Sequence, residues 1–290
     1  MISVLFAVLT AISNGSASVL QRRAAATVPD SDAMHLSLFR HLLKKKVWLA
    51  GIGLVIVAAV CQAVALATGP IAVVQPIFVI ELPSTLIIAG YVFRSRLPRT
   101  AWYGVAAVTL GLALGMACAA PGGGRETVPG ASWIPALIGT VLFEAVLITL
   151  AQRTRGNPRA ALFGLAAACS YALTAALMKD AVARLADGDG IVKLFESWQL
   201  YATAVAGVGA LFLLQNALQA GQLVASQPML TLGDALISIT YGVTLFGETL
   251  NTGWWLLPQL LALGLIAAGC VELARSPLAS GNRPPKPRVV

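Results

Sequence analysis

The chain has 290 residues, of which 58% are hydrophobic and only 11% are charged, and its mean hydropathy is +0.80. A soluble globular domain carries about 25% charged residues, so this composition excludes one and indicates a protein with several membrane spans. The formal net charge of +8 does not indicate nucleic-acid binding, because the Lys and Arg residues stand in short clusters between apolar runs.

Runs of about 20 apolar residues predict transmembrane helices. The sequence contains nine such runs, at about 2–20, 47–68, 70–93, 101–119, 132–151, 160–178 or further, 194–218, 223–246 and 254–273. The first run is not interpreted as a signal peptide, because no basic segment precedes it. In the loop that follows, residues 36–43 are expected to form an amphipathic helix at the membrane surface. The tail, 275–290, is polar and proline-rich, and we expect it to be disordered in the cytoplasm.

The chain contains an internal repeat, because residues 69–118 align without a gap on residues 221–270. The register rests on the rarer matches, which are Gln75-Pro76 with Gln227-Pro228, Trp102 with Trp254, and Cys118 with Cys270. The expected divisions are a first repeat of four helices at 1–120, a loop and connecting fifth helix at 121–156, a second repeat at 157–274, and the tail at 275–290.

The basic residues predict the orientation, because Lys and Arg accumulate in cytoplasmic loops. Sixteen of the 20 fall on one side of the nine-helix topology, within 22–46, 94–99, 153–159 and 275–288. We therefore expect the N-terminus outside and the C-terminus in the cytoplasm. Five helices per unit would invert the second copy. Consistent with this, Arg96 in the basic turn "RSRLPR" aligns with Glu248 in "GETLNTG", which has no Lys or Arg.

The segments of the form G-P/Q-x-x-x-x-Q-P at 69–76 and 221–228, followed by "FGETL", resemble the drug/metabolite transporter superfamily, which includes the EamA-like exporters. The resemblance covers about 2–272 and implies two inverted repeats and secondary transport. The nine-helix layout and the opening "SNGSASVLQRRAA" are more similar to the NIPA-type magnesium transporters than to ten-helix EamA-type exporters. Two features depart from the family pattern: the turn "RSRL" stands where the family has a Glu, and Glu81 matches no family motif.

Three acidic residues, Glu81, Glu144 and Asp234, stand well inside predicted helices, and no Lys or Arg is expected at comparable depth. A carboxylate near the bilayer centre costs at least about 2.5 kcal/mol, so each requires a bound cation or a proton. The alternative is a purely structural role, in which each carboxyl is protonated and hydrogen-bonded within a helix interface. Glu81 lies one residue from the repeat position of Asp234, which would place both near the midplane. Glu248 and Glu272 stand at helix ends, where we expect them to be solvated.

Each Gln-Pro pair is a candidate helix break. Pro76 and Pro228 remove a backbone donor and free a carbonyl one turn earlier, which either lines a binding cavity or marks a simple kink. Gln75 and Gln227 each offer a donor and an acceptor beside that break, and Asn14 adds an amide on the first helix.

The sequence gives little support to an enzyme. Both His residues lie in the first loop, and the four Cys residues lie singly within apolar runs, where we interpret them as packing residues. No phosphate-binding loop is present, so no nucleotide or other cofactor is expected.

The sequence thus predicts an all-α secondary transporter of the cell membrane, which moves a small solute or cation by alternating access. A divalent-cation pore of the magnesium type and a non-transporting scaffold subunit remain open alternatives. The expected partners are the lipid bilayer and a small-molecule or cation substrate, with a homodimer also open and nucleic acid not expected.

Overall fold

The computed structural model describes residues 2–25, 45–92, 99–186, 191–220 and 223–275. In these ranges the elements are helices, apart from a β-bridge between Gly122 and Thr249. The helices are α1 (Ile2–Ala25), α3 (Lys46–Thr68), α4 (Ile71–Ile77), η2 (Phe78–Ile80), α5 (Glu81–Val92), α6 (Arg99–Ala119), α7 (Gly130–Arg153), α8 (Asn157–Ala183), η3 (Arg184–Ala186), α9 (Ile191–Glu196), α10 (Trp198–Ala220), α11 (Leu223–Thr244), η4 (Gly253–Trp255) and α12 (Leu256–Ala274). The expected helix at 36–43, the turn at 93–98 and the tail from 276 lie outside the described residues.

Seven helical segments are long and apolar enough to cross a membrane. They are Ile2–Leu20, Lys46–Thr68, Ile71–Val92, Arg99–Ala119, Gly130–Arg153, Asn157–Ala183 and Gly253–Leu273. Within the described residues, the apolar part of α10 covers Trp198–Leu214, and α11 is not among the seven. An all-helical protein with several membrane-spanning helices is therefore confirmed, and seven of the nine expected spans are among these segments.

The segment Ile71–Val92 is one span with an irregular centre. The α-helix ends one residue after Pro76, and a 3₁₀ turn over η2 connects it to α5, where Pro83 removes a second backbone donor. In contrast, α11 continues through Pro228, so the helix break expected there is wrong. The repeat position of Pro83 in α11 is Ala235, which keeps its donor. One proline is tolerated, and two prolines seven residues apart interrupt the helix.

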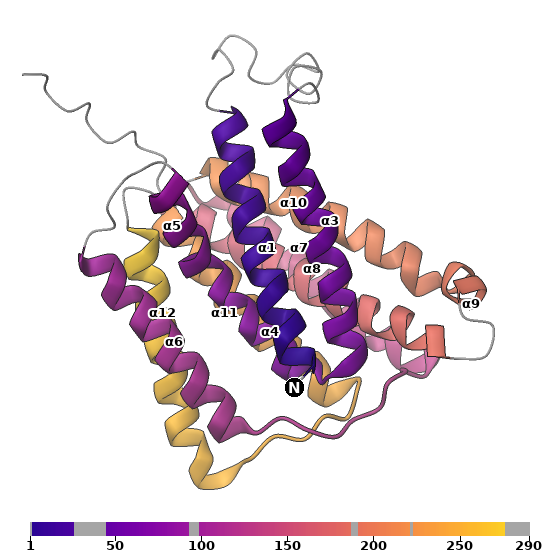
Figure 1. Cartoon of the computed structure of the whole chain (residues 1–290). Coiled ribbons are helices and arrows are strands. Elements are labelled where there is room, and N and C mark those ends of the chain that lie inside the picture. Colours follow the sequence, from indigo (N-terminus) through magenta and orange to yellow (C-terminus); the bar gives the residue numbers. More distant parts are fainter. Residues whose placement is uncertain (1, 26–44, 93–98, 187–190, 221–222, 276–290) are drawn as a thin grey trace, which may run out of the picture.

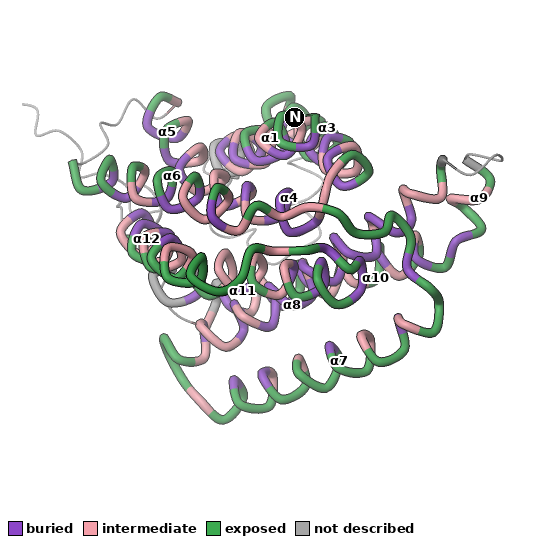
Figure 2. The backbone as a smooth tube through the Cα atoms, turned by 90° about the horizontal axis from the view of Figure 1, so that it is seen from below, coloured by how far each residue is buried: buried purple, intermediate pink, exposed green. Residues whose placement is uncertain are grey.

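Helix α8 is the central element. It packs on α7 and α3 as well as on α10 and α11, and most of its length is buried. The other half of the chain is organised in the same way, with α1 packed on α3 and on α4, η2 and α5. Figure 2 shows α7 at the edge of the bundle, with most of its length exposed. Its long-range contacts are mainly with α8, so its large apolar side chains suit contact with lipid.

Helices α6 and α12 form an antiparallel pair at one side of the bundle (Figure 1). A Cβ on Gly104, near the start of α6, would lie 3.1 Å from the Gly269 carbonyl, near the end of α12. One on Gly111 would lie 2.9 Å from the Ala262 carbonyl, further toward the start of α12. The backbones therefore approach closely in opposite directions, and both glycines are needed for that approach.

One end of the bundle is held together by backbone pairing between loops, and we call it the loop end. The loop after α6 runs beside the loop after α11, as the lower part of Figure 1 shows. Gly122 and Thr249 exchange two backbone hydrogen bonds, and the Arg125 N–H donates to the Phe246 carbonyl at 2.7 Å. The N-terminus of α1 also lies here, because Ser3 packs against Gly69.

Candidate functional site

Glu81 lies inside the bundle, at the point where the 3₁₀ turn becomes α5. Asn14 of α1 donates from Nδ2 to Glu81 Oε2 at 3.4 Å. The two helices approach closely because Gly15 has no side chain, and a Cβ there would lie 2.9 Å from Thr85 Oγ1. Asn14, the amide that the sequence adds on the first helix, thus contacts Glu81.

Asp234 of α11 faces the same region from the second half of the chain. Ser238, one turn later, donates to Asp234 Oδ1 at 3.4 Å. The carboxyls of Asp234 and Glu81 are close enough to interact electrostatically, and the hydroxyl of Tyr171 on α8 interacts with both. We call Asn14, Glu81, Tyr171 and Asp234 the acidic site.

The acidic site has the chemistry of a cation or proton site. Its two carboxyl groups have no ion-pair partner among the described residues. Both are enclosed by protein, yet each side chain keeps part of its surface accessible. A deep carboxylate without a basic partner requires a proton, a cation or water, and two adjacent carboxylates make that requirement stronger.

Glu144 belongs to a different cluster. It lies on α7 and accepts a hydrogen bond from Ser170 Oγ on α8 at 2.5 Å. Close by, the hydroxyls of Thr140 and Tyr241 are hydrogen-bonded to each other, which links α7 to α11. Ser170 precedes Tyr171 of the acidic site, so neighbouring residues of α8 serve two polar clusters. The structure thus places Glu144 apart from Glu81 and Asp234.

Gln75 lies in α4 directly before Pro76, and 2% of its surface is exposed. Its Nε2 has no hydrogen-bond partner, and among the described contacts none joins Gln75 to Glu81 or Asp234. The side chain of Gln227 lies outside what the structure describes, so its expected role at the site stays a prediction.

A buried ion pair that the sequence did not predict lies at the loop end. The Nζ of Lys179 lies 2.6 Å from Oε1 of Glu248, and the two residues are 6% and 2% exposed. Glu248 also accepts the backbone N–H groups of Ile71 and Ala72 at 2.6 and 2.9 Å, where α4 begins. Glu248 was expected to be solvated, and that is wrong, because α4 and α8 enclose it.

The sequence left the end of the sixth predicted helix open, at 178 or further, and the structure extends it. Helix α8 continues to Ala183, so Lys179 and Asp180 occupy its last, buried turns. Asp180 accepts hydrogen bonds from the Val128 backbone at 3.0 Å, Trp133 Nε1 at 2.9 Å and Gln199 Nε2 at 2.8 Å. It therefore ties α8 to the starts of α7 and α10.

The sequence did contain a signal for these two residues. The apolar pattern of α8 continues on both sides of the single Lys-Asp pair, as Ala175 to Leu177 and Ala181 show. Two adjacent opposite charges within a continuing apolar run are typical of a buried pair of polar side chains with partners on other helices.

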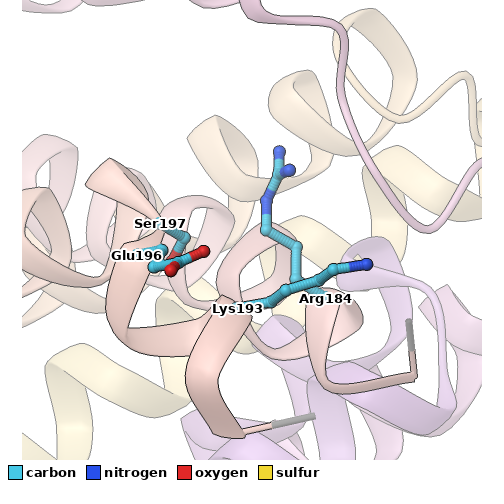
Figure 3. A pocket seen from close by; sticks show the side chains of 4 residues that line it. All are labelled: Arg184, Lys193, Glu196 and Ser197. Atoms are coloured by element: carbon cyan, nitrogen blue, oxygen red, sulfur yellow. The ribbon is translucent and has the colours of Figure 1, made fainter. Parts of the chain in front are cut away.

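A pocket of about 280 Å³ lies beside the end of α8 and α9 (Figure 3). It is lined by Arg184, Lys193, Glu196 and Ser197 and is open to solvent. Arg184 is already engaged, since its guanidinium lies 3.4 Å from Asp180 Oδ2. No group of three or more His, Cys, Asp or Glu side chains suited to a metal ion occurs in the described ranges.

Comparison with known proteins gives a match over most of the chain. The chain is 26% identical to an uncharacterized protein of Corynebacterium glutamicum over 285 residues, which is 98% of both chains. The similarity therefore extends over nearly the whole length of both chains. No protein-family profile and no solved structure matches the chain.

Proposed function

We propose that the protein is a secondary transporter of the drug/metabolite type, EamA-like and similar in layout to the NIPA-type magnesium transporters. It moves a small solute or cation across the cell membrane by alternating access, driven by a gradient. The observation that carries this proposal is the acidic site. Glu81 and Asp234 come from nearly equivalent positions of the two repeats, interact electrostatically inside the bundle and have no basic partner among the described residues.

The arrangement of the halves supports inverted repeats. Helices α6 and α12 occupy equivalent repeat positions and pack antiparallel, as a two-fold axis in the membrane plane requires. An axis along the membrane normal would make them parallel. The exposed Trp102 and Trp254, also equivalent, accordingly lie at opposite ends of this pair. Exposed Trp at both ends suits the two interfaces of a bilayer.

The nine-span topology rests on α10 and α11 in addition to the seven apolar segments. They contain 23 and 22 residues, long enough to cross the hydrocarbon core, and both pack along α8. Two polar residues of α11, Ser226 and Ser238, are buried against protein. The basic clusters then place the N-terminus outside and the C-terminus in the cytoplasm.

The site itself shows the same two-fold character. Ser13 aligns with Ser170, so Asn14 corresponds to Tyr171; Asn14 is hydrogen-bonded to Glu81, and Tyr171 interacts with both Glu81 and Asp234. A site built from both repeats is what alternating access requires, because both halves must contact the substrate in each state. The two carboxyls suit a cationic substrate or a coupling proton.

The test is uptake by the purified protein in liposomes, with Mg²⁺, a cationic dye and a neutral amino acid as probes. Asp234→Asn and Glu81→Gln keep the shape of each side chain and remove its charge. We expect either change to reduce transport at least about tenfold, because each variant lacks one of the carboxylates that bind the cation or proton. Glu272→Gln, near the end of α12, is the matched control and should transport like the parent.

The outcomes separate the alternatives. Saturable uptake that depends on Asp234 and Glu81 supports a carrier, whereas single-channel conductance would indicate a divalent-cation pore. Normal uptake by the Asp234→Asn/Glu81→Gln double variant at every pH tested would refute the acidic site. No transport of any probe by the folded parent would favour a scaffold subunit.

A further inference from the structure

The loop end is closed by contacts between the two repeats. Besides the pairing of Gly122 with Thr249, the backbone N–H of Asn251 donates to the Ala119 carbonyl at 2.9 Å. These bonds join the loop after α6 to the loop after α11. They lie over the end of the bundle toward which α8 and α11 run.

Glu248 is the side chain that connects these elements in the interior. Its carboxylate accepts two backbone N–H groups from the first repeat, at Ile71 and Ala72, and an ammonium from the second, at Lys179. The Lys179 Nζ also lies 4.5 Å from the centre of the Phe246 ring. Each strong donor around this carboxylate is thus buried and paired, and Glu248 joins the start of α4 to the last turns of α8.

Gly242 lies next to the Lys179–Glu248 pair and leaves space for it. A Cβ on Gly242 would collide with a carboxylate oxygen of Glu248 and would lie 2.9 Å from Ile71 Cγ2. The absence of a side chain there lets the loop after α11 place Glu248 directly against the start of α4. The packing of Glu248 against the start of α4 therefore requires a residue without a side chain at position 242.

The repeat offers no counterpart of this pair at the other end. By the alignment of 69–118 on 221–270, Glu248 corresponds to Arg96, and by the alignment of Ser13 on Ser170, Lys179 corresponds to Arg22. The first repeat thus has two cations at the positions that correspond to the acid and the base of the loop end. Like charges repel, so the equivalent attraction cannot form.

We propose that the Lys179–Glu248 pair is the gate of the loop end, and that it holds the transporter closed at that end and open toward the other. This proposal rests on the proposed transport function, and it says that the loop end is closed when the pair is formed and open when the pair separates. A buried pair that forms in one state only biases the equilibrium by its differential stability. Opening of the loop end requires Glu248 to leave both Lys179 and the start of α4.

The test is the accessibility of a thiol on the loop-end side of the acidic site. Ser238 is fully buried and lies one turn from Asp234 toward the loop end, so Ser238→Cys is placed in a variant without the four native cysteines. A membrane-impermeant thiol reagent is added from either side of oriented vesicles. The gate is removed by Lys179→Met/Glu248→Gln, which leaves no unpaired buried charge.

We expect the double variant to react from the loop-end side at least about tenfold faster than the Ser238→Cys parent. Lys179→Met alone should also react faster, and Lys193→Met, which removes a cation from the same end, should react like the parent. Equal rates in the double variant and the parent, with both folded by thermal unfolding, would overturn the gate. Since labelling needs no substrate, a faster rate without transport would retain the gate and refute the transport function instead.

Discussion

Asp180 offers a quantitative test of the loop end. Asp180→Ala leaves three donors without an acceptor: the Val128 N–H, Trp133 Nε1 and Gln199 Nε2, all on residues that are at most 3% exposed. Each buried donor left unsatisfied costs about 1–3 kcal/mol. Even the low end of that range gives a loss of about 3 kcal/mol in the free energy of unfolding.

The measurement is thermal unfolding of the detergent-purified protein by circular dichroism. A loss of this size should lower the unfolding temperature by at least about 6 °C for a chain of this length. Asp180→Asn keeps one acceptor oxygen and should fall between Asp180→Ala and the parent. Glu196→Gln, an exposed acid at the same end, is the control and should be neutral.

A double-mutant cycle makes the argument specific. Trp133→Phe removes one of the three donors, so its effect and that of Asp180→Ala should be less than additive, by about 1 kcal/mol. If Asp180→Ala unfolds within about 1 °C of the parent, or if the two changes add fully, the hydrogen-bond account of Asp180 is refuted.

Two further predictions concern the gate and the topology. Gly242→Ala should destabilise the protein by at least about 1 kcal/mol, because its methyl group meets Glu248, whereas Gly264→Ala, with nothing within 4 Å, should not; equal unfolding temperatures would contradict the packing at Gly242. A reporter fused after Arg288 should lie in the cytoplasm, and a thiol at the exposed Glu126 should react from outside; finding both on one side would refute the nine-span topology.

The sequence predicted the helical segments well because lipid imposes a strong local rule, which is about 20 apolar residues for each crossing. It also anticipated that Glu81 and Asp234 would lie close together, because a repeat register carries three-dimensional information. The polar contacts of the loop end could not be obtained in this way. Lys179 finds its partner 69 residues later and Asp180 finds Val128 52 residues earlier, and no local pattern contains those distances.

Pro76 and Pro228 show a related limit. Both follow a Gln at the same repeat position and both are the sixth residue of their helix, so the local pattern predicts the same break. The helix breaks only where Pro83 follows. Likewise, hydropathy left the end of the sixth predicted helix open at 178 or further, because it weighs a charged residue by its type and not by the partners it will find.

The antiparallel pair of α6 and α12 has a consequence for biosynthesis. Helix α6 leaves the ribosome before five other long helices. The last of these is α12, its main partner, which ends at Ala274. At about 5–20 residues per second, α6 remains in the bilayer for roughly ten to thirty seconds before its glycine face is covered. During that interval Gly104 and Gly111 expose backbone carbonyls to lipid or to a temporary helical neighbour.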